Sequence, residues 1–113
     1  MSNAQYNPSL LLEMMDGNQN EVNELAHMLF DLAPQMLAEI EFCIDEKKWE
    51  MAGDVSHKLK SSLKLWKMNN LVPYALYIEK NGRNNTNYDE IIKNFEALKI
   101  GLNKVLILMK KEY

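Results

Sequence analysis

His57 lies in a basic segment whose residue types suit the binding of an anion. Lys58 follows it directly, Lys60 follows within about one helical turn, and Lys64 comes one turn later. Such a cluster places several positive charges near one imidazole ring, and a phosphoryl or carboxylate group is the kind of partner it would attract. On an unremarkable helix, the same pattern would be a solvated surface, so the elements around His57 decide between the two interpretations.

The segment from Ala52 to Trp66 has the apolar period of a helix with one buried stripe. The stripe consists of Ala52, Val55, Leu59, Leu63 and Trp66. At about 100° per residue, His57 projects roughly opposite to it and is expected to face solvent. The same outer side is expected to carry a docking surface for another protein, made of Asp54, Ser61, Lys64, Leu65 and Met68. Ser61 would allow close approach to the imidazole, and Leu65 and Met68 would offer apolar area.

Four other segments have helical patterns, and no stretch has the alternation of a β-strand. They are a short helix from Ser9 to Met15, a long one from Asn18 to Asp45 with Pro34 inside, one from Leu71 to Lys80, and one from Tyr88 to Lys111. Short connections make neighbouring helices antiparallel. The sequence therefore predicts an all-α fold, an up-down antiparallel four-helix bundle with a short extra N-terminal helix.

Polar residues between these segments predict how the helices begin and end. Asn69-Asn70 is expected to break the chain after the His57 helix and to cap the next one. Asn81-Gly82 is expected to end that helix, and Thr86 with Asp89 to start the last one in a capping-box manner.

Glu79 or Lys80 is expected to lie at the height of His57. The turn between the two helices centres near residue 68 or 69, and these two residues lie about as far beyond it as His57 lies before it. The alternative for Glu79 is a surface partner for a lysine.

Length and composition predict one domain over residues 5–113, with residues 1–4 interpreted as a remnant of protein expression. The net charge of −3 gives no reason to expect nucleic acid as the main partner, and no stretch reaches the roughly 20 apolar residues of a membrane span. Cys43 is the single cysteine and excludes an intramolecular disulfide. A cytoplasmic protein without membrane insertion is expected.

The order His-x-Leu-Lys-[small]-Ser, here His57-Lys58-Leu59-Lys60-Ser61-Ser62, resembles the signature of histidine-containing phosphotransfer (HPt) domains. The similarity includes Trp49 before the histidine helix and the pair Ile78-Glu79 on the next one, and it extends as a register of helices from about Pro8 to Met109. Two departures stand out. Ser61 occupies a position that is usually glycine, and Trp66-Lys67-Met68 replaces a Leu-Gly-Ala type of turn.

The resemblance implies a phosphoryl carrier of a two-component phosphorelay rather than an enzyme, since the sequence has no glycine-rich or other ATP-binding motif. His57 would take a phosphoryl group on Nε2 from the aspartyl phosphate of a receiver domain and pass it to another receiver. Lys60 would offset charge on the phosphoryl group, and Glu79 would orient the histidine. The domain itself would bind no cofactor and no metal, and Mg²⁺ would be held by the receiver, which belongs to a response regulator or a hybrid sensor kinase.

Two other functions fit the same residues. One is an HPt-like adaptor that binds receivers without being phosphorylated, which the departures at Ser61 and at the helix end allow. The other is a plain helical interaction domain, which would have no use for an exposed histidine beside Lys60.

Overall fold

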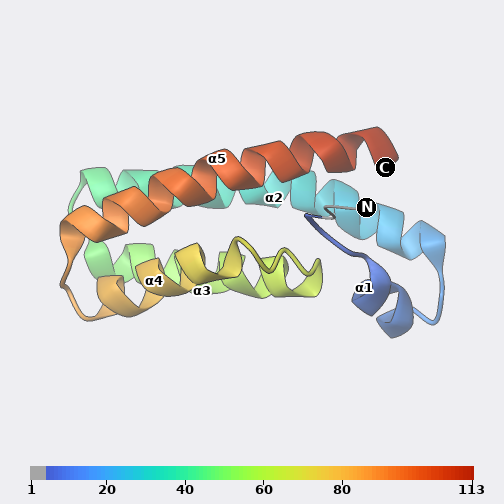
Figure 1. Cartoon of the computed structure of the whole chain (residues 1–113), viewed down its shortest axis with the longest axis horizontal. Helices are drawn as coiled ribbons and strands as arrows, with labels where there is room; N and C mark the ends of the chain where they lie inside the picture. The colour runs from blue at the N-terminus through green and yellow to red at the C-terminus, as the bar shows by residue number, and fades with distance from the viewer. Residues whose placement is uncertain (1–4) are drawn as a thin grey trace.

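The structure is a computed structural model that describes residues 5–113, so the predicted expression remnant, residues 1–4, lies outside the described residues. Five helices and no strand occur within this range (Figure 1), which confirms the all-α prediction. They are α1 (Ser9–Met14), α2 (Gln19–Asp45), α3 (Trp49–Leu65), α4 (Val72–Arg83) and α5 (Tyr88–Glu112).

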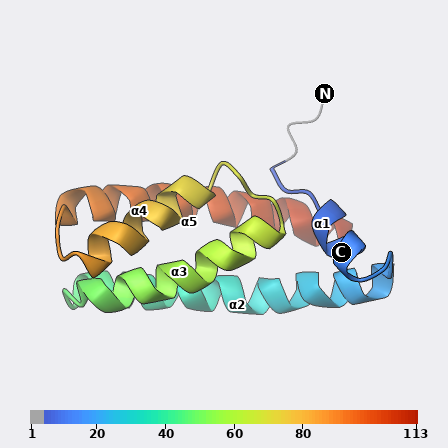
Figure 2. The same ribbon diagram turned by 90° about the horizontal axis from the view of Figure 1, so that it is seen from below.

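The helices form an elongated body of 42 × 26 × 19 Å. The two long helices, α2 and α5, lie in one layer, and α3 and α4 lie in a second layer beside them (Figures 1 and 2). Helix α3 packs against both α4 and α2, while α5 packs against α4 and, over a shorter stretch, α2. The closest packing in the molecule is between α3 and α4, the two helices that carry His57 and Glu79.

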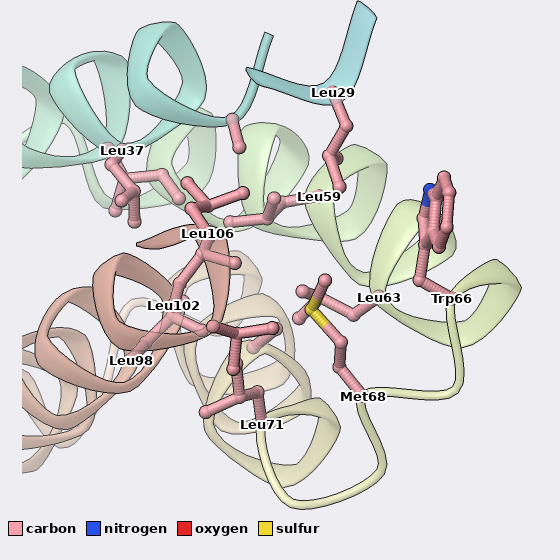
Figure 3. Close-up of a cluster of buried hydrophobic side chains, with 14 of the residues drawn as sticks. Leu29, Leu37, Leu59, Leu63, Trp66, Met68, Leu71, Leu98, Leu102 and Leu106 are labelled. Atoms are coloured by element: carbon pink, nitrogen blue, oxygen red, sulfur yellow. The ribbon is translucent and has the colours of Figure 1, made fainter. Parts of the chain in front are cut away.

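The core lies between the two layers, and leucine is its most frequent residue (Figure 3). Leu59 and Leu63 on α3 are fully buried, as the apolar stripe of the sequence predicts, and Leu98, Leu102 and Leu106 of α5 are buried in the same cluster. Each fully buried leucine contributes about 1.5–3 kcal/mol relative to an exposed one. On α2, Ala33 and Leu37 are buried, whereas Leu32 is exposed.

Helix α1 lies across one end of the molecule, close to the C-terminus (Figure 1). The main-chain amide of Asn7 donates to the Trp66 carbonyl oxygen at 2.8 Å, and Tyr6 packs against the rings of Trp66 and Tyr113. These contacts join the start of the described chain, the end of α3 and the C-terminus, and so close this end of the core.

Several helix ends differ from the sequence predictions. Helix α3 ends at Leu65 because Lys67 has a φ of 52°, which turns the chain before the expected break at Asn69-Asn70. Helix α4 begins after Leu71 without a side-chain cap and continues through Gly82 to Arg83. The expected capping box of Thr86 is also wrong, since α5 begins after Asn87, whose side chain makes no capping bond.

None of the helices between residues 5 and 113 has an apolar stretch long enough to cross a lipid bilayer.

Candidate functional site

His57 and Glu79 lie side by side at the surface between α3 and α4. Nδ1 of His57 and Oε2 of Glu79 are 2.8 Å apart. The imidazole side chain is 49% exposed, whereas that of Glu79 is only 10% exposed. The structure therefore confirms that His57 faces solvent and that Glu79 lies at its height, with the carboxylate beneath the ring edge rather than in open solvent.

Two cations complete the surroundings of the Glu79 carboxylate. Lys60 donates from Nζ to Oε1 at 2.6 Å, and Arg83 donates from NH1 to Oε2 at 2.9 Å. Lys60 is itself 12% exposed, so its charge is largely withdrawn from solvent. Glu79 thus contacts His57 and a lysine at once, as a largely buried carboxylate rather than the surface partner that the alternative expected.

Arg83 connects this cluster to a residue of the expected docking surface. Its Nε donates to Oδ1 of Asp54 at 2.9 Å, while its NH1 holds Glu79. Charge-assisted hydrogen bonds of this kind fix geometry as well as charge. His57, Glu79, Lys60, Arg83 and Asp54, hereafter the Glu79 cluster, form one connected network across α3 and α4.

The Glu79 cluster keeps its central carboxylate ionised. Burial acts to raise the pKa of Glu79, but the hydrogen bonds and charges of Lys60 and His57 outweigh it, so the pKa is lowered from its ordinary value of 4.5. Glu79 is consequently a carboxylate at neutral pH and can only accept hydrogen bonds.

An ionised Glu79 determines which nitrogen of His57 carries a proton. Because Oε2 can only accept, Nδ1 must donate the hydrogen atom in the bond between them. In the neutral ring, the lone pair then lies on Nε2. No hydrogen bond within residues 5–113 involves Nε2, so the free lone pair is on the atom pointing away from the carboxylate.

Close approach of the α3 and α4 backbones creates this geometry. Cβ atoms added at Gly53 and Gly82 would lie 2.9 Å from the Glu79 carbonyl oxygen and 2.5 Å from that of Trp49. The fully buried Ser56 hydroxyl donates to the carbonyl oxygen of Ala75 at 2.7 Å and ties the same two helices. Gly53 and Ser56 were not singled out from the sequence, and Gly82 was interpreted only as a helix end, although two small residues on facing helices are a signal of close packing.

Four of the five expected docking residues are exposed around His57: Asp54, Ser61, Lys64 and Leu65. The Ser61 hydroxyl donates back to the His57 carbonyl oxygen at 3.3 Å. Met68 is the exception and the prediction for it is wrong, because it is fully buried (Figure 3). The expectation extended the helix to residue 68, whereas the left-handed backbone at Lys67 turns Met68 inward.

An apolar surface on α2 adjoins the exposed side of α3. Met28 and Leu32 of α2, with Leu65 of α3, line a shallow depression of about 120 Å³. Met28 and Leu32 are both exposed, and the sequence analysis did not assign them to the surface around His57.

No cluster of three or more His, Cys, Asp or Glu side chains suited to a metal ion occurs in the part of the chain that the structure describes. His27, the second histidine, is exposed on α2 and packs edge-on against Phe30, with 5.4 Å between the ring centroids.

Comparisons of the chain with models of known protein families, with curated proteins and with solved structures found no match.

Proposed function

We propose that this chain is a histidine phosphotransfer domain, in which His57 accepts a phosphoryl group from the aspartyl phosphate of a receiver domain and passes it to another receiver. The observation that carries the proposal is the 2.8 Å hydrogen bond between Nδ1 of His57 and Oε2 of Glu79. It leaves the lone pair of a neutral ring on Nε2 of a half-exposed side chain, which is what a nucleophile toward an incoming phosphoryl group needs.

The transfer conserves charge and atoms between the two proteins. The lone pair of His57 Nε2 forms a bond to phosphorus while the bond from phosphorus to the receiver's aspartate oxygen breaks, and the aspartate leaves as a carboxylate. The ring gains positive charge, and Nδ1 keeps its hydrogen atom in the bond to Glu79. The negative carboxylate at this position stabilises the charge that develops on the ring. Return of the phosphoryl group to a second receiver reverses these changes.

Lys60 and Arg83 are proposed to keep Glu79 in place and to balance its charge. Both cations donate to the carboxylate that accepts from Nδ1 of His57, and these charge-assisted bonds fix its position against the ring. We further propose that Lys60 offsets charge on the phosphoryl group, because it follows His57 on α3 within about one turn and its ammonium binds the same carboxylate as His57.

The proposed partner is a receiver domain that docks over the exposed side of α3. Ser61, Lys64 and Leu65 are accessible there, and the apolar side chains of Met28 and Leu32 extend the surface onto α2. Mg²⁺ and the acidic pocket would come from the receiver, and the domain would act in the cytoplasm. The proposed architecture is an up-down antiparallel four-helix bundle of α2–α5, which the short connections between these helices support.

Incubation with a phosphorylated receiver tests the proposal. The chain should acquire phosphate that is labile in acid and stable in base, and His57→Gln should abolish it without a change in thermal stability. His27→Gln is the matched control, since it removes the other histidine from an exposed helical position. Transfer to His57→Gln at the rate of the unmodified chain would overturn the assignment.

Measurements of receiver binding distinguish the two alternative functions, an adaptor and a plain helical interaction domain. Binding that weakens in Ser61→Arg, in the absence of any phosphoryl transfer, would identify an adaptor, for which the serine in place of the usual glycine is the favouring feature. Absence of both binding and transfer across several receivers would leave a plain helical interaction domain.

A further inference from the structure

Arg83 of the Glu79 cluster is held between two carboxylates of unequal exposure. Its NH1 donates to Oε2 of Glu79 at 2.9 Å, and its Nε donates to Oδ1 of Asp54 at the same distance. The Glu79 side chain is 10% exposed, whereas that of Asp54 is 62% exposed. An ion pair in open solvent is weak, so the bond to Asp54 is the weaker of the two. Arg83 is therefore anchored on Glu79 and is the more easily released from Asp54.

The guanidinium group of Arg83 lies close to the imidazole ring of His57. NH1 of Arg83 and Nδ1 of His57 bind the same atom, Oε2 of Glu79, at 2.9 and 2.8 Å. The two nitrogens can therefore be no further apart than the sum of these distances, about 5.7 Å. NH2 of Arg83 makes no hydrogen bond within residues 5–113, and the side chain is 44% exposed. A free donor on a side chain with room to move thus lies near the ring.

Asp54 and a phosphoryl group on His57 would compete for Arg83. Asp54 precedes His57 by three residues on α3, a spacing that makes two side chains neighbours on a helix surface. A phosphoryl group carries a charge of about −1.5 to −2 at neutral pH and three acceptor oxygens, whereas a carboxylate carries a single charge. The planar fork of an arginine also suits phosphoryl oxygens. The competition therefore favours the phosphoryl group.

We infer that phosphorylation of His57 moves Arg83 from Asp54 to the phosphoryl group. The bond from NH1 to Glu79 is kept, the bond from Nε to Asp54 breaks, and the guanidinium group turns to donate to the phosphoryl oxygens. Asp54 is thus a positioning residue, which holds Arg83 beside His57 in the unphosphorylated chain. The inference rests on the proposed function, because it takes His57 as the residue that is phosphorylated.

The exchange gives Asp54 an influence on phosphoryl transfer. Phosphorylation must break the salt bridge between Asp54 and Arg83, and release of the phosphoryl group restores it. A carrier must give up the group that it accepts, and an anion that competes for the same cation favours this release. Asp54 therefore weakens the hold of Arg83 on the phosphoryl group.

The other cations near His57 are less suited to such an exchange. Lys60 is 12% exposed and lies 2.6 Å from Oε1 of Glu79, so it acts from a fixed position. Lys58 and Lys64 are exposed and make no hydrogen bond to the cluster within the described residues. Of these cations, Arg83 alone is both anchored beside His57 and paired with an exposed anion that it can leave.

NMR of the chain loaded with phosphoramidate tests the exchange without a receiver. In the loading reaction, Nε2 of His57 bonds to phosphorus while the phosphorus–nitrogen bond of the reagent breaks, and ammonia leaves. Before loading, the signal of the Arg83 Nε–H group should differ between the unmodified chain and Asp54→Asn, since only the former has the carboxylate partner. After loading, the two signals should nearly coincide, because Arg83 then binds the phosphoryl group in both chains.

Two results would overturn the inference. One is an Arg83 signal that does not move when the unmodified chain is loaded, and the other is a difference between the two chains that persists after loading. Glu50→Gln is the matched control, because it removes an exposed carboxylate one turn before Asp54 on α3 that makes no bond to Arg83. It should leave the Arg83 signal unchanged in both states.

A second measurement tests whether Arg83 contacts the phosphoryl group. In the loaded chain, Arg83→Gln should raise the second pKa of the phosphoryl group by about one pH unit, because loss of an adjacent cation disfavours the dianion. The matched control is Lys64→Gln, which removes an exposed cation two turns beyond His57 and should raise this pKa less. Equal rises would indicate a general effect of positive charge and would overturn the contact. Both variants keep the other charges of the cluster, those of Asp54, Lys60 and Glu79.

These measurements separate the inference from the proposed function. If loaded His57 passes its phosphoryl group to no receiver, the proposed function fails, whereas the movement of Arg83 is still decided by the NMR signals. If phosphoramidate does not phosphorylate His57, Nε2 is not the accessible nucleophile that the hydrogen bond to Glu79 indicates, and both proposals fail.

Discussion

Gly53 of α3 lies directly against the main chain of Glu79 on α4. A Cβ atom at position 53 would be 2.9 Å from the Glu79 carbonyl oxygen and 3.1 Å from the main-chain nitrogen of Arg83. Both obstacles are backbone atoms, so they cannot move without moving α4. The missing side chain at position 53 therefore sets the separation between the helix of His57 and the helix of its carboxylate partner.

Gly53→Ala should separate these helices. Alanine is the better helix former by about 1 kcal/mol, yet we expect a net destabilisation of about 1–3 kcal/mol from the forced shift of α4. Phosphoryl transfer should fall as well, because the shift lengthens the bond between Glu79 and His57. Urea unfolding and the transfer rate from a phosphorylated receiver measure the two effects.

Gly101→Ala is the control for this change. Its added Cβ would come 2.5 Å from Cδ2 of Leu71, which is the end of a flexible side chain. The leucine can change rotamer, so the cost should be smaller and transfer should stay at the original rate. Equal transfer losses in both variants would show that close approach of α3 and α4 is not what positions Glu79.

Glu79→Gln and Glu79→Ala should differ in transfer. A glutamine side-chain oxygen can still accept from Nδ1 of His57, whereas alanine leaves the ring without a partner and the buried Lys60 ammonium without its acceptor. We expect a rate loss of about tenfold for alanine and a smaller one for glutamine, with about 1–3 kcal/mol of stability lost in the alanine variant. Identical rates for the two variants would contradict an orienting role.

Glu79 also predicts how stability depends on pH. Its pKa is lowered in the folded chain, so below the ordinary value of 4.5 the unfolded chain binds this proton first. The stabilisation from Glu79 is complete above that value and is lost as the pH falls through the lowered pKa. The unfolding free energies of the unmodified chain and Glu79→Gln, measured between about pH 3 and pH 7, should therefore converge toward low pH. A constant difference over this range would contradict the lowered pKa.

The parts of the site that depend only on the geometry of a helix could be predicted from the sequence. His57 lies opposite a regular apolar stripe, and equal distances from one turn limit its neighbour on the next helix to Glu79 or Lys80. Both arguments need only the rise and the angle per residue, which do not depend on neighbouring helices.

Features that depend on packing could not be predicted in the same way. Met68 is buried because Lys67, a residue type with no preference for positive φ, ends α3 one turn early. Gly82 was interpreted as a helix end because glycine commonly ends helices, whereas here it lies against the main chain of Trp49. Helix α4 instead continues to Arg83, whose bonds to Glu79 and Asp54 did not follow from the sequence.

Lys60 and Lys64 provide a matched pair for the role of charge near His57. The Lys60 side chain is 12% exposed and lies on Glu79 at 2.6 Å, whereas Lys64 is exposed one turn further along α3. Lys60→Ala should destabilise the chain by about 1–3 kcal/mol and slow transfer by about tenfold, at low and high salt alike, because a largely buried charge is weakly screened.

Lys64→Ala should leave stability unchanged and slow transfer only at low salt, since an exposed lysine acts on the encounter with the receiver. Transfer rates at two salt concentrations, with melting curves for both variants, make the comparison. If Lys60→Ala leaves the transfer rate unchanged, the role of Lys60 is confined to fixing the position of Glu79 in the folded chain. A salt-dependent loss in Lys60→Ala equal to that in Lys64→Ala would instead mean that the two lysines act alike on the approaching partner, and that the bond to Glu79 contributes nothing to the reaction.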